Sequence, residues 1–250
     1  MERKDFRFVT ESNYPESYDK FLERIYSFQK SDFSFGCERL NPSFSVQRKV
    51  DISGQFKEFC GDTVVFELDN FQKRFIREYY IEPLYEVGFG CLAEQLFEQT
   101  LHMTLHDLNA SDMIEFIPDN MFYDEIRLAN MMREFNFGSH EIRMETTCVF
   151  NMVNTSLVLG LKPKSSSDYD VLMRLYQLID GVHQLPYPFT PHITLAYYNC
   201  NGFEGERLLS IEKKVNELNR ETFDITLSTD RLYYQKFTSM NEYFNIMHFS

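Results

Sequence analysis

The tetrapeptide His-x-Thr-Leu occurs twice in this sequence, as HMTL at residues 102–105 and as HITL at residues 192–195. Both copies have the composition of β-strands, and on a strand alternate side chains share one face. His102 is therefore expected to point with Thr104, and His192 with Thr194. The Met, Ile and Leu residues of the two copies point the other way, which predicts that they belong to the hydrophobic core.

The segments around the two tetrapeptides follow the same order. In the first half, a strand at 63–68 precedes a helix at about 71–80 that Pro83 limits, a short helical stretch at 93–97, and a strand at 101–108. In the second half, a strand at 156–161 precedes a helix that begins near Ser167 or Asp168, and then a strand at 192–198. This repeat predicts two related lobes that present their His-Thr pairs to one cleft.

The remaining elements predict a mixed α+β fold with antiparallel strand pairing. We expect helices at 15–29, 123–135 and 206–218, and strands at 141–152, 223–227, 231–237 and 243–249. The two lobes then occupy residues 63–250. Residues 1–62 lie outside the repeat, and we expect them to form an N-terminal extension that packs on the lobes or acts as a lid.

The composition indicates a globular protein that does not bind long nucleic acids. Of the 250 residues, 43% are hydrophobic and 25% are charged, as in folded domains. The 38 acidic and 25 basic residues give a net charge of −13. Such a surface repels long phosphate polymers and anionic membranes, although a local pocket can still bind one small phosphorylated ligand.

Membrane, export and disulfide signals are missing from the sequence. No stretch approaches the roughly 20 consecutive apolar residues of a membrane helix, and the charged first ten residues lack the apolar run of a signal peptide. The five cysteines are scattered without a C-x-x-C pair, which predicts reduced thiols rather than a zinc site or a disulfide framework. We therefore expect a cytoplasmic protein.

The two His-Thr pairs suit acid–base chemistry on a phosphate. A neutral imidazole can take a proton from water or a hydroxyl, and a protonated imidazole can give one to the leaving oxygen. Two threonine hydroxyls can donate hydrogen bonds to the non-bridging oxygens of a phosphate between them. Such an in-line displacement requires no metal or other cofactor. We assign His102 as the general base and His192 as the general acid, and the near-symmetric arrangement also allows the reverse.

With its paired motifs 90 residues apart on repeated lobes, the chain resembles the two-histidine (2H) phosphoesterase superfamily. The resemblance covers about residues 63–249, and TPHITLA at residues 190–196 is especially typical. This superfamily contains RNA 2′–5′ ligase-like proteins, 2′,3′-cyclic phosphodiesterases and 2′–5′ oligoadenylate phosphodiesterases. The resemblance implies a bilobal, pseudo-symmetric α+β fold, with two antiparallel sheets and flanking helices around a central cleft. It also implies metal-independent chemistry with a four-residue site: His102, Thr104, His192 and Thr194.

Further side chains are candidates for substrate binding. His106 continues the face of the first pair, and Tyr198 continues that of the second pair, where its ring can stack on a base. Tyr197 faces the core under strict alternation, but a β-bulge would reverse its direction. Cations that can hold a phosphate occur at four positions that the sequence does not rank: Arg127, Arg143, Lys162 and Arg231.

The expected function is hydrolysis of a 2′,3′-cyclic phosphate or a 2′–5′ linkage in a small nucleotide or short oligoribonucleotide. One alternative is a nucleotide-binding module without turnover, although a pure binder has no need of both histidines. The other is an RNA 2′–5′ ligase, which the acidic charge balance makes less attractive. The exact substrate and the oligomeric state are left open by the sequence.

Overall fold

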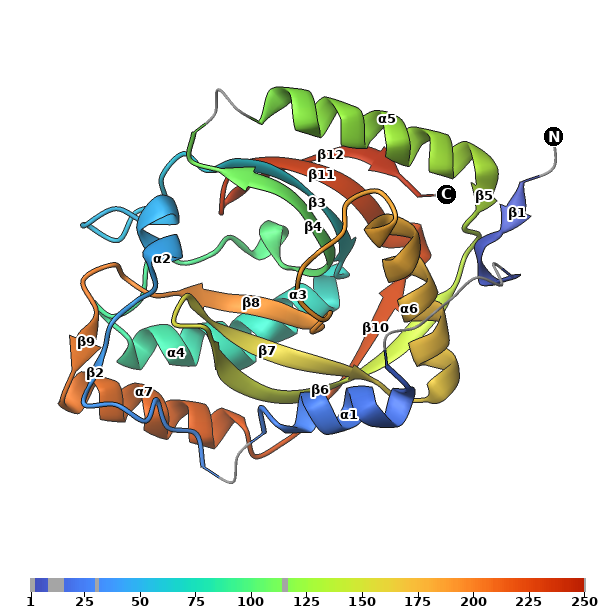
Figure 1. Ribbon diagram of the computed structural model, residues 1–250. Coiled ribbons are helices and arrows are strands. Elements are labelled where there is room, and N and C mark those ends of the chain that lie inside the picture. The colour runs from blue at the N-terminus through green and yellow to red at the C-terminus, as the bar shows by residue number, and fades with distance from the viewer. Residues whose placement is uncertain (1–2, 9–15, 30–31, 114–116, 250) are drawn as a thin grey trace.

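Two four-stranded antiparallel units form the centre of the protein, as seen in a computed structural model that describes residues 3–8, 16–29, 32–113 and 117–249 (Figure 1). One unit has the strand order β4-β3-β11-β12, and the other has the order β10-β6-β7-β8. β4 and β8 pair antiparallel and join the two units into one eight-stranded sheet. The strands are β3 Cys60–Glu67, β4 His102–Ser111, β6 Glu141–Met152, β7 Ser156–Pro163, β8 His192–Tyr197, β10 Asp224–Ser228, β11 Leu232–Ser239 and β12 Glu242–His248.

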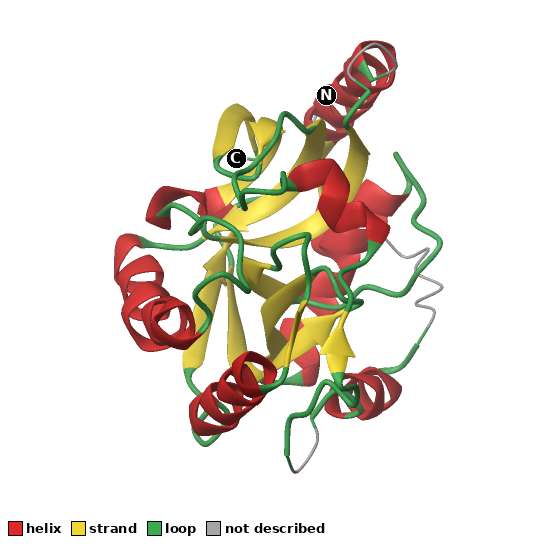
Figure 2. Ribbon diagram, turned by 90° about the vertical axis from the view of Figure 1, so that its left-hand side faces the viewer, coloured by secondary structure: helices red, strands yellow, loops and turns green. Residues whose placement is uncertain are grey.

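Helices lie outside the two units, so that the strands occupy the centre of the molecule (Figure 2). The strand–helix–strand order occurs twice, as β3-α3-β4 and as β7-α6-β8, which confirms the predicted repeat and the bilobal α+β fold. Within the described residues no helix is long and apolar enough to cross a membrane. The helices of the two lobes are α3 Asn70–Ile76, α4 Glu82–Val87, α5 Pro118–Glu134, α6 Ser166–Asp180 and α7 Glu206–Leu218, with a π-helical turn at Arg77–Ile81 and 3-10 turns at Glu98–Thr100 and Thr229–Arg231.

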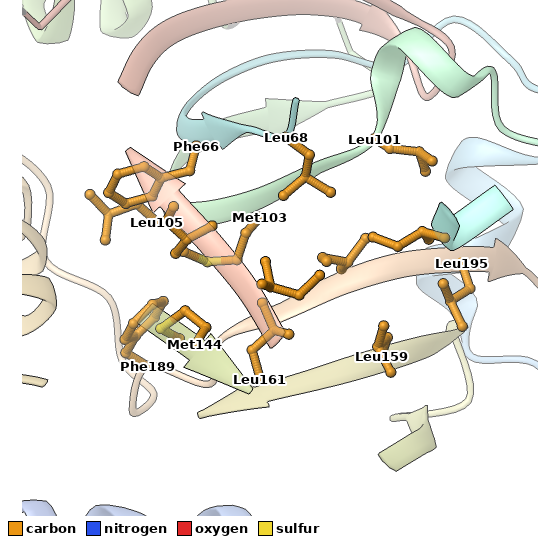
Figure 3. Packing of buried hydrophobic residues seen from close by; sticks show 14 of the residues in the cluster. Phe66, Leu68, Leu101, Met103, Leu105, Met144, Leu159, Leu161, Phe189 and Leu195 are labelled. Atoms are coloured by element: carbon orange, nitrogen blue, oxygen red, sulfur yellow. The ribbon is translucent and has the colours of Figure 1, made fainter. Parts of the chain in front are cut away.

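The main hydrophobic core lies on the side of the motif strands that faces away from the histidines. Met103 and Ile193 pair with each other across the β4–β8 junction and are 0% exposed. Leu105 and Leu195 are buried in the same core, together with Phe66 and residues of β6 and β7 (Figure 3). The apolar residues of both tetrapeptides are therefore core residues, as the alternation predicts.

The described part of the first 62 residues packs on both lobes. Helix α1, Tyr18–Tyr26, buries Phe21 and Ile25 in the main core, and the Tyr18 hydroxyl donates a hydrogen bond to the Pro163 carbonyl at 2.8 Å. Helix α2, Phe44–Lys49, buries Val46. Short strands and one turn complete this region: β1 Lys4–Asp5 with β5 Phe135–Asn136, β2 Arg39–Leu40 with β9 Phe203–Glu204, and a 3-10 turn at Phe6–Phe8.

Two helix predictions were wrong. Residues 93–97 form no helix, because the backbone N–H of Ala93 donates to the Tyr197 carbonyl and holds the segment beside β8. Pro83 does not end the helical region, which continues to Val87. Pro83 stands in the first turn of α4, where its missing N–H is not needed, after a π-helical turn that shifts the hydrogen-bond register.

Candidate active site

Each motif strand has a β-bulge directly after its threonine. In β4 the register with β3 shifts between Thr104 and His106. In β8 the register with β7 shifts between Thr194 and Ala196. The leucine that ends each tetrapeptide is thus an extra residue, and the two lobes have the same irregularity at the same place. A bulge of this kind reverses the alternation of the side chains that follow it.

The bulges decide which neighbours face the histidines. Tyr197 and its counterpart Asp107 line the cleft, whereas Tyr198 does not. Tyr198 is 0% exposed and its hydroxyl donates to Asn151 Oδ1 at 3.1 Å, so the structure does not bring it to the site. The reversal that a bulge was expected to cause at Tyr197 is therefore present.

His106 borders the cleft but is 1% exposed. Its Nδ1 bonds to the Asp107 carbonyl oxygen at 2.6 Å, and its Nε2 bonds to Asp180 Oδ1 at 3.1 Å. Its ring also packs on Tyr176. Both ring nitrogens have protein partners, and these contacts tie β4 to the end of α6.

The cleft has a volume of about 730 Å³ and is lined by both histidines and both threonines of the two motifs. β4 and β8 are antiparallel and pair at the residue between the histidine and the threonine of each motif. His102 therefore lies across from Thr194, and His192 lies across from Thr104. The four side chains are all partly exposed. The structure thus brings the four predicted catalytic residues together in one compact quartet.

The two imidazoles are oriented by matching hydrogen bonds. His102 Nδ1 donates to the Thr100 carbonyl at 2.7 Å, and His192 Nδ1 donates to the Thr190 carbonyl at 2.7 Å. A carbonyl oxygen can only accept, so the proton of each neutral ring is on Nδ1. Within the described part of the chain, neither Nε2 has a protein hydrogen-bond partner. Each Nε2 is therefore available to a ligand in the cleft, as a base when neutral and as an acid when protonated.

The N-terminal helix supports the loop before His192. Arg24 of α1 donates from one guanidinium nitrogen to Thr190 Oγ1 at 3.1 Å and from the other to the Phe189 carbonyl at 2.8 Å. Glu16 pairs with the same guanidinium. These bonds hold the backbone whose carbonyl orients His192, and they give one described part of the extension a direct link to the site.

The threonine hydroxyls are the second component of the quartet. The hydroxyls of Thr104 and Thr194 line the cleft and make no hydrogen bond to any of the residues described. A hydroxyl on a strand face can rotate and donate its proton to an oxygen of a bound ligand. Together with the two Nε2 atoms, they offer four polar groups to a tetrahedral anion.

Burial makes both histidines less basic. Desolvation lowers the pKa of His102 from its ordinary value of 6.5 to about 4, and desolvation also lowers the pKa of His192. The carboxylate of Asp107 acts against desolvation and raises the pKa of both rings. Lys73 lowers the pKa of His102 but is not among the charges that act on His192. In the ligand-free protein both rings are therefore mainly neutral at pH 7.

None of the four cations proposed from the sequence lines the cleft; all four are engaged by carboxylates elsewhere. The pairs are Arg127–Asp124, Arg143–Asp168, Lys162–Glu145 and Arg231–Asp69. The cleft instead contains Lys49 from α2, which sequence reasoning missed. Lys49 lies in a stretch without a clear periodic pattern, so only the packing of α2 on the lobes could have placed it there.

Comparison with known proteins supports the fold. No family model and no curated protein matches the chain. A conserved protein of unknown function, ATU0111, from Agrobacterium tumefaciens str. C58 is 16% identical, with a TM-score of 0.60, over 84% of this chain and 94% of that chain. E. coli LigT in apo form is 14% identical (TM-score 0.43; 76% and 96% covered), and a protein described as a phosphoesterase is 12% identical (TM-score 0.44; 75% and 95% covered). This chain therefore shares its fold with the Agrobacterium protein, on the TM-score of 0.60.

Proposed function

We propose that this protein is a metal-independent phosphodiesterase of the 2H type. Its substrate is a 2′,3′-cyclic phosphate or a 2′–5′ linkage in a small nucleotide or short oligoribonucleotide. The observation that supports this most is the quartet itself: two imidazoles with matching Nδ1 hydrogen bonds, and two threonine hydroxyls without a hydrogen-bond partner among the described residues, around one cleft. The resemblance of both motifs to the 2H superfamily favours the same function.

The proposed reaction is an in-line displacement at phosphorus. The threonine hydroxyls donate hydrogen bonds to the non-bridging oxygens. One neutral imidazole takes a proton from the attacking water, whose oxygen forms the new P–O bond. The bond from phosphorus to the ribose oxygen breaks, and the other imidazole, protonated beforehand, gives its proton to that oxygen. The products are a phosphate ester and a free hydroxyl, and the two rings have exchanged protonation states.

We assign His102 as the base and His192 as the acid. A base must be neutral before the reaction, and the nearby Lys73 ammonium favours the neutral form of His102. No such cation acts on His192. The Asp107 carboxylate favours the protonated form of both rings, and the weaker effect of Glu67 on His102 does not cancel that of Lys73. This difference in charge favours one of the two assignments of base and acid, which the near-symmetric fold alone would leave equivalent.

The net charge of the chain and the volume of the cleft favour a small substrate. The chain has a net charge of −13, and the cleft of about 730 Å³ has room for a ligand of nucleotide or dinucleotide size. Long RNA would bring many phosphates against an acidic surface, whereas a short ligand presents only the phosphates that the cleft receives.

The test is a turnover screen of 2′,3′-cyclic nucleotides, 2′–5′ oligoadenylates and cyclic dinucleotides. We expect turnover that survives a chelator and falls by about 10²- to 10⁴-fold in His102→Ala and in His192→Ala. His248→Ala is the matched control, because His248 bonds to the Asp230 carbonyl outside the cleft. Full activity in either cleft variant would contradict the mechanism. Tight binding without any product would favour the nucleotide-binding alternative, and joining of RNA ends would favour the ligase.

A further inference from the structure

Lys49 is the one Lys or Arg among the described residues that line the cleft. It is the last residue of α2, and its Nζ lies 5.1 Å from the ring centroid of Tyr197 and 5.1 Å from that of Phe59. Tyr197 stands on the motif strand β8 and also lines the cleft. The ammonium is therefore held at the cleft wall by two aromatic faces, each of which attracts a cation.

The Lys49 ammonium has no ion-pair partner in the part of the chain that the structure describes. No carboxylate of the described residues lies within 4 Å of its Nζ. Its neighbour Arg48 is different, although its guanidinium packs on the same Phe59 ring at 5.4 Å. Arg48 forms an ion pair with Asp112 at 2.7 Å and does not line the cleft. In a protein with an excess of acidic residues, an unpaired ammonium in a cleft marks a place for an anion from outside the chain.

Lys49 lies beyond the quartet rather than within it. Tyr197 follows Thr194 by three residues, but Leu195 between them is the bulged residue. The two therefore stand opposite Ser156 and Val158, which are two residues apart on β7, or about 7 Å at 3.3 Å per residue. The charges that act on His102 and His192 include Asp107 but not Lys49. The position on β4 that is equivalent to Tyr197 is Asp107, so the two lobes differ in charge at this place: the first has a carboxylate and the second has an aromatic ring beside an ammonium.

We propose that Lys49 and Tyr197 form a subsite for a second phosphate group of the nucleotide whose scissile phosphate lies in the quartet. The separation of about one nucleoside along β8 fits a ligand with phosphates on both sides of one ribose. This inference rests on the proposed function for the position of the first phosphate. It also gives the N-terminal extension a role, because α2 supplies a binding group that neither lobe contains.

The experiment compares two ligands that differ by one phosphate. Adenosine 3′-monophosphate and adenosine 3′,5′-bisphosphate are titrated by calorimetry into wild type, Lys49→Gln, Lys49→Arg and the control Arg48→Gln. We expect the bisphosphate to bind wild type about tenfold more tightly, as one charge-assisted hydrogen bond provides. Lys49→Gln should abolish that ratio, Lys49→Arg should restore most of it, and Arg48→Gln should keep it.

Turnover gives the second arm, with 2′,3′-cyclic AMP and its 5′-phosphorylated form as substrates. The ratio of the two kcat/KM values should fall about tenfold in Lys49→Gln. An equal loss for both substrates would overturn the inference, because it would place Lys49 at the scissile phosphate. Equal binding of both ligands by wild type, or no binding of either, would overturn it as well. Absence of turnover with an intact binding ratio would contradict the proposed function and leave the subsite standing.

Discussion

An anion in the quartet should raise the pKa of one cleft histidine and draw a proton into the protein. In the free protein the pKa of His102 is about 4, so protonating it at pH 7 costs about 4 kcal/mol at 1.36 kcal/mol per pH unit. A unit negative charge 4 Å from the ring, at an effective dielectric constant of 20, contributes about 4 kcal/mol in the opposite direction. Binding should therefore bring the pKa of one ring from about 4 to about 7.

Sulfate is the appropriate probe, because it remains a dianion above pH 5 and any proton taken up belongs to the protein. A pKa that moves from about 4 to about 7 predicts uptake of nearly one proton at pH 6. It also predicts that sulfate binds about tenfold more tightly at pH 6 than at pH 8. Calorimetry at pH 6 in two buffers of different ionisation enthalpy measures the uptake directly.

Variants at the two cleft histidines separate this coupling from general effects of charge. His102→Gln and His192→Gln each remove one ring, and at least one of them should abolish the uptake. His248→Gln should retain it, because its ring bonds to the Asp230 carbonyl away from the cleft. If sulfate binds to wild type with no proton uptake and no dependence on pH, then the neutral state of the free histidines, and the reasoning from burial, is refuted.

Three other perturbations test the structure around the quartet. The pKa of His102 is lower in the folded protein than in the unfolded chain, so its contribution to the free energy of unfolding is present above pH 6.5 and is lost as the pH falls towards 4. Urea titrations over this window should show a loss of about 3 kcal/mol from this residue, and His102→Gln should lack that part of the loss. Asp107→Asn removes a charge that raises the pKa of both histidines, so the bell-shaped pH profile of kcat/KM should move to lower pH, and an unmoved profile would exclude that role. Gly160 of β7 pairs with His192, and Gly160→Ala places a Cβ 2.5 Å from Oγ1 of Thr147 in β6, so it should cost about 1 to 3 kcal/mol in thermal unfolding; wild-type stability would show that the strand has room.

The motif strands could be predicted because their signals are local. His-x-Thr-Leu specifies alternation within four residues, and the same four residues place Met103 and Ile193 in the core. The strand–helix–strand repeat around each motif then predicts two lobes, which the sheet order confirms. The quartet follows from these two facts, because related lobes present equivalent strand faces to one cleft.

The flanks of the site depend on interactions that no local pattern encodes. Tyr197 rather than Tyr198 faces the cleft because the register shifts against β7, and the periodicity within β8 does not reveal this shift. Residues 93–97 have helical composition, but the backbone N–H of Ala93 donates to the Tyr197 carbonyl of β8 and that of Glu94 donates to the Gly54 carbonyl, and the segment forms no helix. Lys49 reaches the cleft only because α2, which is more than 140 residues away from Tyr197 in the chain, packs beside it. Tertiary contacts override local preference at each of these positions.

For the proposed phosphodiesterase, the repeated bulge provides a way for a nearly symmetric fold to bind its substrate in one direction. Both lobes place a side chain three residues after the motif threonine on the cleft face, so the two positions are equivalent in geometry. The first lobe has Asp107 there, and the second has Tyr197 with Lys49 over its ring. A second phosphate of the ligand is attracted to the Lys49 ammonium beside Tyr197 and repelled by the Asp107 carboxylate. The proposed subsite thus orients the substrate, and the Lys73 ammonium, which acts on His102 and is not among the charges that act on His192, favours His102 as the base.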